Sequence, residues 1–330
     1  MNWKKTRVLV TGAGGFIASH LTEELTRRGA KVRALVRYNS RNHWGFLDEM
    51  DKTLAKRVEV WPGDITDSAY VHELVSGQDV VFHLAALISI PYSYAAPESF
   101  VAVNVRGTLN VLEACRRHGT AKLVHTSTSE VYGTALYTPI DEKHPLQGQS
   151  PYSASKIGAD HMAESYHRSF GLPVAIARPF NTYGPRQSAR AVIPTILTQL
   201  LAGAKVLRLG SLGPARDFNY VADTVSGFLA VAAEPSTVGQ AVNIGSGRAV
   251  RIDEVVRLSQ KLLGTKVPVS MDRARVRPAR SEVQMLLCDN RKARRLLDWK
   301  PRFTLEEGLV RTADYLRRHL DRYKTHLYNI

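Results

Sequence analysis

Tyr152 and Lys156 are the two residues whose types and spacing most directly suggest chemistry. Four positions apart, they would lie on one face of a helix that Ser150 can cap and Pro151 can begin. An ammonium group beside a phenol favours the phenolate and lowers a pKa of about 10 towards neutrality. The pair therefore predicts a tyrosine that exchanges protons with a substrate, with two ordinary surface residues as the alternative.

A second reactive group follows the buried strand predicted around residues 123–124. The chain continues there into Thr128, Ser129 and Glu130, which are two hydroxyls and one carboxylate. We expect the end of this strand to open toward the helix of Tyr152, with a solvated carboxylate at a strand end as the alternative for Glu130. The predicted catalytic residues are Thr128, Ser129, Glu130, Tyr152 and Lys156.

A glycine-rich turn follows the apolar strand predicted at residues 7–10, and an amphipathic helix follows the turn. Gly12, Gly15 and Ala18 have the spacing G-x-x-G-x-x-A. The glycines permit a tight turn and close approach of the backbone to a pyrophosphate, whose charge the helix N-terminus favours. A turn of this kind between a strand and a helix predicts dinucleotide binding.

Arg37 ends the second predicted strand, residues 31–36, where an NAD site usually has an acidic residue. An arginine can pair with a 2′-phosphate, so this position favours NADP, with a surface arginine as the alternative. A third strand at residues 58–61 precedes Asp64, whose carboxylate can accept a hydrogen bond from an adenine amino group.

Two further predicted strands, residues 79–84 and 173–178, continue the alternation of strands with helices. This alternation predicts an α/β fold with a doubly wound parallel sheet of the Rossmann type and ligands at the carboxyl ends of its strands. Within it, we expect His83 to be a packed core residue, and Asn104, on a long helix at residues 99–118, to shape the active site.

The chain becomes rich in turns after Arg178, which indicates a second unit. We predict a dinucleotide-binding domain at residues 1–180 with a return at about 221–247. Residues 181–220 and 248–330 would form a smaller mixed C-terminal substrate domain, with mostly short helices toward its end.

Three arginines of this second unit, Arg186, Arg216 and Arg277, fall in loops or beside them rather than on helix faces. Each alone could be solvated, but together they predict a site for a diphosphate. The formal net charge of +15 also favours an anionic small ligand, and no nucleic-acid motif accompanies it.

Composition indicates an ordinary globular protein of 330 residues with 44% hydrophobic and 23% charged residues. We find no apolar run long enough to cross a bilayer and no signal-peptide pattern, so we expect a cytoplasmic protein without a membrane partner. Cys115 and Cys288 lack metal-ligand spacing, so we expect reduced packing residues and no metal site.

The sequence resembles the extended short-chain dehydrogenase/reductase superfamily over essentially its whole length. The matching segments are residues 11–21, 63–64, 83–86, 104–108, 178–185 and 216–218, together with Tyr152 and Lys156. The surroundings of Tyr152 and residues 187–194 are most similar to sugar-nucleotide 4,6-dehydratases of the legionaminic-acid type. Ala18 departs from the usual glycine, and Arg37 resembles the NADP-using GDP-mannose dehydratases.

The resemblance implies a homodimer that binds a nucleotide-diphosphate sugar and a tightly held NADP or NAD. The implied cofactor residues are Gly12, Gly15, Phe16, Ile17, Arg37, Asn39, Ser40, Asp64, Ile65, Leu84, Ala85, Ala86, Asn104, Tyr152, Lys156 and Pro179. The implied substrate residues are Ser89, Thr128, Asn181, Arg186, Val192, Arg216, Asn219 and Arg277.

The triplet at residues 128–130 implies 4,6-dehydration of UDP- or GDP-N-acetylglucosamine or a related hexose, which gives a 4-keto-6-deoxy sugar by internal hydride transfer. UDP-glucuronate decarboxylases share this triplet, and 4-epimerases share Tyr152 and Lys156, so both reactions are alternatives. A non-catalytic dinucleotide-binding protein is a further alternative, which the intact Tyr152 and Lys156 pair argues against.

Overall fold

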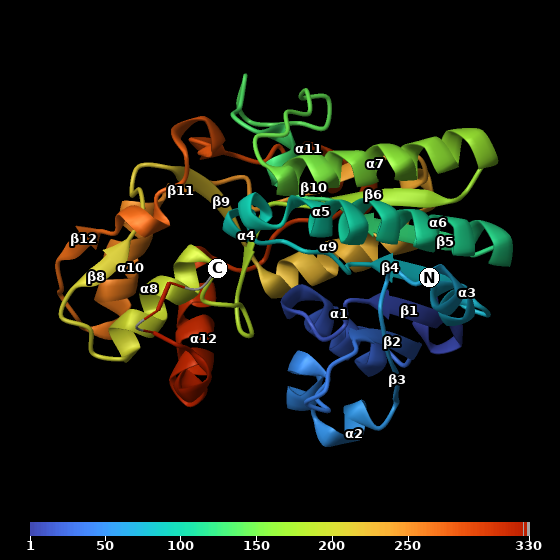
Figure 1. Ribbon diagram of the computed structural model, residues 1–330, viewed down its shortest axis with the longest axis horizontal. Coiled ribbons are helices and arrows are strands. Elements are labelled where there is room, and N and C mark those ends of the chain that lie inside the picture. Colours follow the sequence, from blue (N-terminus) through green and yellow to red (C-terminus); the bar gives the residue numbers. More distant parts are fainter. Residues whose placement is uncertain (326, 329–330) are drawn as a thin grey trace.

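The computed structural model describes residues 1–325 and 327–328. Figure 1 shows a large sheet between layers of helices, with a smaller lobe beside it that contains α8, α10 and α12. In the described part of the chain, we find no helix with the length and apolarity needed to span a bilayer.

The large sheet has seven parallel strands in the order β10-β6-β5-β4-β1-β2-β3. Its strands are β1 (Arg7–Thr11), β2 (Lys31–Arg37), β3 (Val58–Gly63), β4 (Val80–His83), β5 (Lys122–Thr126), β6 (Val174–Pro179) and β10 (Ala241–Ile244). The order reverses between β1 and β4, and that crevice is where open α/β sheets bind ligands.

Alternation along the central strands divides the core between two faces. Val8 and Val10 of β1 pack into one cluster with helices α1 (Phe16–Arg27) and α9 (Val221–Ala233). Leu9 packs into the opposite cluster, with α3 (Ser68–Val75), α6 (Gly107–His118) and α7 (Pro151–Phe170). Strands that are buried on both faces need continuous apolar sequence, which explains the run Val-Leu-Val in β1.

The smaller lobe contains two short sheets and the longest C-terminal helices. One sheet joins β7 (Asn181–Tyr183), β9 (Ala215–Tyr220), β11 (Ala249–Arg251) and β13 (Met285–Leu286), and the other joins β8 (Leu207–Leu209) to β12 (Val269–Met271). Its helices are α8 (Val192–Leu201), α10 (Ile252–Leu263) and α12 (Leu305–Arg318), whereas α11 (Arg291–Leu297) packs against β10. The expectation of mostly short helices toward the C-terminus was wrong for α10 and α12, which have 12 and 14 residues. The strands β11, β12 and β13 were not predicted, because strands of two or three residues are too short to show alternation.

The long helix predicted at residues 99–118 is divided by a π-helical turn. Helix α5 (Pro97–Phe100) leads into the π-helix η3 (Val101–Arg106), which continues as α6. Asn104 lies in this turn, and its side chain bonds both backbone groups of Leu87 and the Ser155 hydroxyl. Single π-helical turns of this kind are frequent at functional sites.

The remaining helices are short. They are α2 (Lys52–Ala55), α4 (Ile90–Ala95), and the 3₁₀ helices η1 (Trp3–Lys5), η2 (Gly45–Glu49), η4 (Ser129–Tyr132), η5 (Pro235–Thr237), η6 (Arg273–Arg275), η7 (Ala279–Ser281) and η8 (Leu320–Arg322).

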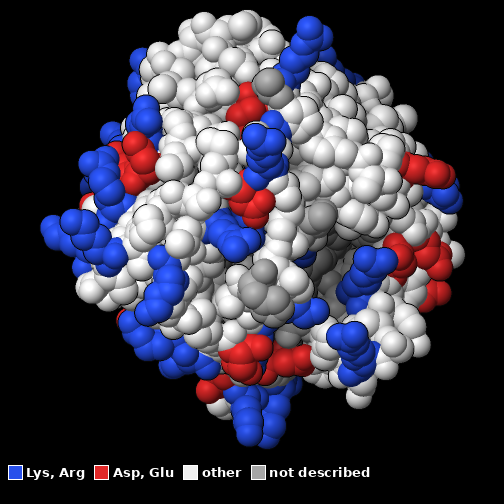
Figure 2. Space-filling model, turned by 60° about the vertical axis from the view of Figure 1, so that its left-hand side comes forward, with Lys and Arg blue, Asp and Glu red and all other residues white. Residues whose placement is uncertain are grey.

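Lys and Arg side chains are spread over the face shown in Figure 2, with Asp and Glu among them, and do not form one patch there. On this face, the basic side chains are therefore separate, solvated groups and do not form one binding patch.

Candidate active site

Helix α7 begins as predicted and brings Tyr152 and Lys156 to the carboxyl end of β5. Ser150 caps the helix with a capping box, and Pro151 occupies its first turn. Both side chains of the pair are buried, and the Lys156 Nζ donates to the Thr126 carbonyl at 2.6 Å. The Tyr152 hydroxyl forms a hydrogen bond with the Thr128 side chain.

The pKa of Tyr152 differs from the expectation. Burial raises the pKa of this phenol above its ordinary value, the bond to Thr128 opposes the rise, and the charge of Glu130 adds to it. Burial also lowers the pKa of Lys156 to about 8. The predicted depression of the tyrosine pKa by Lys156 is therefore wrong for this arrangement, because loss of hydration dominates and the ammonium group is bonded to a carbonyl.

Glu130 is close enough to both Tyr152 and Arg216 for its charge to act on each of them. It belongs to η4, where the Thr128 hydroxyl accepts a hydrogen bond from the Glu130 backbone at 3.2 Å. Its charge acts on Tyr152 and on Arg216 of β9, and it opposes the lowering of the Arg216 pKa by burial. The structure thus groups Thr128, Ser129 and Glu130 with Tyr152, as the sequence predicts.

The glycine turn lies at the topological switch point and has the shape that a dinucleotide requires. Gly12 has φ +71°, and a Cβ there would lie 2.9 Å from the backbone of Ala85. Gly15 caps α1 without a side-chain bond, which leaves the first N–H groups of this helix available to a phosphate. The bare turn fits the pyrophosphate of a nicotinamide dinucleotide.

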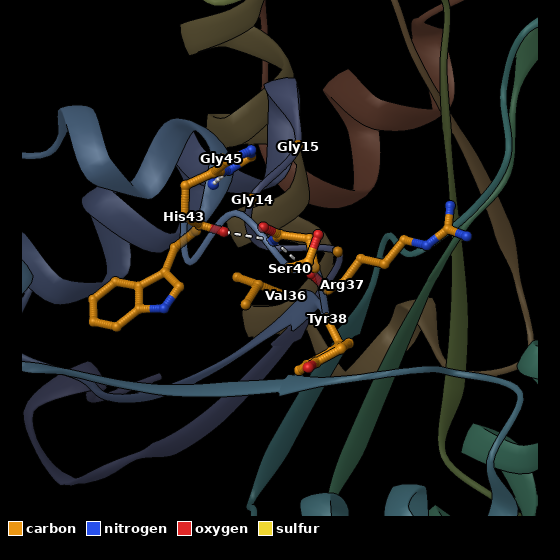
Figure 3. Close-up of a pocket in the computed structure, with 11 residues that line it drawn as sticks. Gly14, Gly15, Val36, Arg37, Tyr38, Ser40, His43 and Gly45 are labelled. Carbon is orange, nitrogen blue, oxygen red and sulfur yellow. Dashed lines mark hydrogen bonds between the residues drawn. The ribbon is translucent and has the colours of Figure 1, made fainter.

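A pocket adjoins this turn and receives the end of β2 (Figure 3). It is lined by Gly12, Gly14, Gly15, Val36, Arg37, Tyr38, Asn39, Ser40, His43, Trp44 and Gly45. The Arg37 side chain extends away from the other labelled residues in Figure 3. Two hydrogen bonds from Thr66 lower the pKa of Asp64, and the Arg37 guanidinium contributes to this effect, so its charge reaches the Asp64 side of the site.

The other predicted cofactor residues also lie at carboxyl ends of the central strands. Phe16 and Ile17 begin α1, Asp64 and Ile65 follow β3, Leu84, Ala85 and Ala86 follow β4, and Pro179 ends β6. His83 is buried and bonds Thr11 and Thr108, which confirms it as a packed core residue. Burial holds its pKa well below the ordinary value.

The loop at residues 38–50 folds over the glycine turn, and only its residues Asn39 and Ser40 were predicted to belong to the site. The Phe46 N–H donates to the Gly14 carbonyl at 3.0 Å, and a Cβ on Gly14 would lie 2.7 Å from the Trp44 carbonyl. The only sequence signal for this contact was a glycine at position 45, which has φ +67° in the structure. An isolated glycine in a polar loop does not reveal which segment it will contact.

Glu49 attaches this loop to the C-terminal region. Its carboxylate accepts a hydrogen bond from the Tyr315 hydroxyl at 2.8 Å and pairs with Arg322. Arg186 approaches the same carboxylate at 3.9 Å and pairs with Glu23 of α1 at 3.0 Å. Arg186 is therefore buried and paired with acids of α1 and of this loop, whereas Arg216 and Arg277 face Glu282.

Arg216 and Arg277 do lie together, and the residue between them is Glu282. Its carboxylate lies 3.0 Å from Arg216 and 3.8 Å from Arg277. Ser281 connects this segment to α4 and to the chain before α7. Its hydroxyl donates to the Gln149 carbonyl at 2.7 Å and therefore accepts from the Tyr94 hydroxyl at 2.6 Å. No sequence pattern predicted that Tyr94, Ser281 and Glu282 belong to this group.

The remaining predicted substrate residues occupy separate elements. Ser89 caps α4, Asn181 begins β7, Val192 begins α8, and Asn219 lies on β9. The buried side-chain oxygens of Asn181 and Asn219 have no hydrogen-bond partner among the described residues. Such acceptors are costly to bury unless a ligand or water satisfies them.

Comparisons with known proteins agree with this geometry. The family described as GDP-mannose 4,6 dehydratase matches residues 9–312. A dTDP-glucose 4,6-dehydratase of Streptomyces antibioticus is 35% identical over 94% of this chain and 92% of that protein. The UDP-glucuronic acid decarboxylase 1 of Xenopus tropicalis is 32% identical over 98% of this chain and 75% of its own length.

A solved structure of UDP-glucuronic acid 4-epimerase from Bacillus cereus, in complex with UDP-glucuronic acid and NAD, has a similar fold. Its TM-score is 0.85 at 28% identity, over 95% of this chain and 99% of that chain. The parallel sheet, the glycine turn and the Tyr152–Lys156 pair define an extended short-chain dehydrogenase/reductase. The chain belongs to the family described as GDP-mannose 4,6 dehydratase, and the proteins it is similar to include a dehydratase, a decarboxylase and an epimerase of nucleotide sugars.

Proposed function

We propose that this protein is a nucleotide-sugar 4,6-dehydratase with a tightly held nicotinamide cofactor. The position of Glu130 carries the proposal, because its carboxylate lies close enough to act on the Tyr152 hydroxyl. Dehydration needs a base for the C5 proton in addition to the tyrosine that serves the 4-oxygen. We propose UDP- or GDP-N-acetylglucosamine, or a related nucleotide hexose, as the substrate.

The residues of the chain divide the proton transfers among them. Tyr152 removes the proton of the 4-hydroxyl, and Thr128, bonded to it, orients the 4-oxygen. Lys156, one turn after Tyr152 on α7, supplies a buried positive charge. A bound nicotinamide would accept hydride from C4 and return it to C6.

Residues of η4 carry out the elimination of water that follows oxidation at C4. Oxidation at C4 acidifies the C5 proton, which Glu130 removes as the 6-hydroxyl takes up a proton and leaves as water. C5 regains a proton when hydride is delivered to C6. Ser129, the neighbouring residue of η4, assists this departure directly or through a water molecule. The Tyr152 phenol then returns its proton to the 4-oxygen only in an epimerase, whereas a dehydratase releases the 4-ketone.

For the cofactor, we propose that NADP is preferred to NAD. Arg37 is exposed at the end of β2, close enough to Asp64 for its charge to lower the Asp64 pKa, and a 2′-phosphate could pair with its guanidinium. The epimerase from Bacillus cereus was solved with NAD, so the preference rests on Arg37.

Incubation with a panel of nucleotide sugars and mass measurement of the products tests the reaction. Loss of water supports dehydration, loss of carbon dioxide indicates decarboxylation, and an isomer of unchanged mass indicates epimerisation. Absence of any product with every nucleotide sugar would favour the non-catalytic alternative.

Decarboxylation is the second candidate. It needs a cation near the C6 carboxylate of the sugar, and Arg216 lies close enough to Glu130 for their charges to interact. Arg216 also pairs with Glu282, which makes it less available for this role.

We also propose a homodimer. Light scattering coupled to size-exclusion chromatography tests this, since a dimer would have about twice the chain mass of 36.6 kDa.

A further inference from the structure

A fully buried ion pair lies beneath the proposed catalytic residues. The Arg178 Nη2 of β6 donates to the Asp160 Oδ2 of α7 at 2.8 Å, and the two side chains are 2% and 0% exposed. Figure 1 shows α7 along the part of the sheet that contains β6. A buried ion pair rarely adds net stability over apolar packing, so its presence calls for another reason.

The Asp160 end of the pair connects α7 to the segment that leads into Thr128. Asp160 follows Lys156 by one helical turn on α7. Its carboxylate accepts a hydrogen bond from the Ser127 hydroxyl at 2.6 Å and lies 3.1 Å from the His125 Nε2. Ser127 directly precedes Thr128, so one carboxylate connects the helix of the acid/base pair to the start of the catalytic triplet.

The Arg178 end connects the pair to the turn that carries Glu130. The Arg178 Nη1 donates to the Tyr132 hydroxyl at 2.7 Å, and its guanidinium lies 4.9 Å from the centre of the Tyr132 ring. Tyr132 closes η4 and donates to Asn243 of β10 at 2.8 Å. Asp160 and Arg178 therefore connect α7, which carries Tyr152 and Lys156, to the segment from Ser127 to Tyr132, which carries Thr128 and Glu130.

Charges around Lys156 come from several elements. Asp160 lies on its own helix, His83 on β4, His125 on β5, and Arg178, on β6, is paired with Asp160. The two histidines have pKa values lowered first by burial, and the charge of Lys156 lowers them further. Asp160 is thus the negative charge that favours the ammonium form of Lys156.

We propose that Asp160 and Arg178 are positioning residues that fix the Tyr152–Lys156 helix against the Thr128–Glu130 turn, and that the Asp160 carboxylate also keeps Lys156 charged. The inference rests on the proposed function for its kinetic part. Its electrostatic part concerns the chain itself and can be measured without substrate.

The first test replaces Asp160 with Asn, which keeps the shape of the side chain and removes its charge. Labelling lysine at Cε with ¹³C, with the Lys156 signal assigned from Lys156→Met, gives the pKa of Lys156 by NMR titration. We expect this pKa to fall in Asp160→Asn. An unchanged pKa in the folded variant would overturn the electrostatic part, and this result does not depend on which reaction the protein catalyses.

Asp223→Asn is the matched control, because Asp223 is also fully buried and accepts two backbone hydrogen bonds, from Arg302 and Phe303. Both variants should unfold at lower temperature than the parent. Only Asp160→Asn should lower kcat by about tenfold or more with KM nearly unchanged, since small misplacements of reacting groups are costly. Equal kcat in the two variants would reject the positioning role.

Tyr132→Phe tests the contact between Arg178 and η4, and it can be used even if Asp160→Asn fails to fold, because the ring of residue 132 stays in place. It removes the hydroxyl that joins η4 to Arg178 and Asn243. We expect slower exchange of the C5 proton, measured by deuterium uptake, at an unchanged rate of cofactor reduction. If both C5 proton exchange and cofactor reduction proceed at the parent rates, the positioning role of the Arg178–Tyr132 contact is rejected. A parent protein that reduces no cofactor with any nucleotide sugar would refute the proposed function instead.

Discussion

At the scale of single residues, Tyr152 determines whether oxidation can begin. Replacement by Phe removes the hydroxyl and keeps the ring in its contact with Phe100. We expect turnover to fall by roughly two to four orders of magnitude, the usual contribution of general acid–base catalysis, while cofactor stays bound. Stopped-flow absorbance of the nicotinamide measures this step, and near-normal turnover would refute the assignment.

Glu130 separates dehydration from epimerisation, because only dehydration exchanges the C5 proton. Glu130→Gln keeps the shape of the side chain but cannot accept a proton. We expect this variant to reduce its cofactor and then stall, with persistent nicotinamide absorbance and no deuterium uptake at C5. Completion of the cycle at the parent rate would show that another group is the base and would move the epimerase alternative ahead.

Arg37 tests the cofactor preference. If it pairs with a 2′-phosphate, NADP should bind more tightly than NAD, and Arg37→Ala should narrow the difference by about 1–3 kcal/mol, the usual range for a charged hydrogen bond. Calorimetric titration of cofactor-free protein measures both affinities. Arg41→Ala, in the same loop, is the control, and equal affinities in the parent would leave Arg37 as a surface residue.

At the scale of elements, the loop at residues 38–50 depends on Glu49 for its attachment. Glu49→Gln removes the charge that Arg186 and Arg322 face and should loosen the loop over the glycine turn. If about 1.4 kcal/mol of closure is lost, bound cofactor should dissociate roughly tenfold faster. Fluorescence of reduced cofactor, chased with excess oxidised cofactor, measures the rate.

Glu24→Gln is the control for Glu49, since Glu24 pairs on the exposed face of α1 with Arg27 and Arg28. Its dissociation rate should equal that of the parent. The same rate in Glu49→Gln would show that the loop closes without this contact.

The elements that sequence predicts well are those with strong periodicity. The buried central strands, and the amphipathic helix predicted after the glycine turn and observed as α1, are fixed by local apolar patterns. The positions of Arg186, Glu282 and the loop at residues 38–50 depend on partners far along the chain, as in the pairing of Glu49 with Arg322. Such contacts leave no periodic signal, and the same applies to the raised pKa of Tyr152, which depends on burial.

At the scale of the whole molecule, buried histidines make stability depend on pH. Burial lowers the pKa of His20 to about 4 and holds that of His83 well below its ordinary value. Near pH 6.5, the unfolded chain therefore begins to bind protons that the folded chain does not, so stability falls as pH falls from about 6.5 to 5. Each histidine contributes up to about 1.4 kcal/mol per pH unit.

Urea unfolding at pH 7 and pH 5.5 measures this dependence. His83→Asn should be less stable at pH 7, because contacts with Thr11 and Thr108 are disturbed, yet should lose less stability on acidification than the parent. An identical loss in both proteins would show that other groups cause the acid sensitivity.

Strand β10 pairs with β6 but lies far along the chain, which affects how the large sheet folds during synthesis on the ribosome. Strand β6 ends at Pro179, but its outer partner, residues 241–244, is synthesised only after much of the smaller lobe. Until then, a nascent chain has an unpaired edge on β6, and unpaired edges invite association with other chains. A chain that ends after residue 180 would keep this edge unpaired permanently. The large sheet therefore needs residues 241–244, which follow the first segment of the smaller lobe, to be complete.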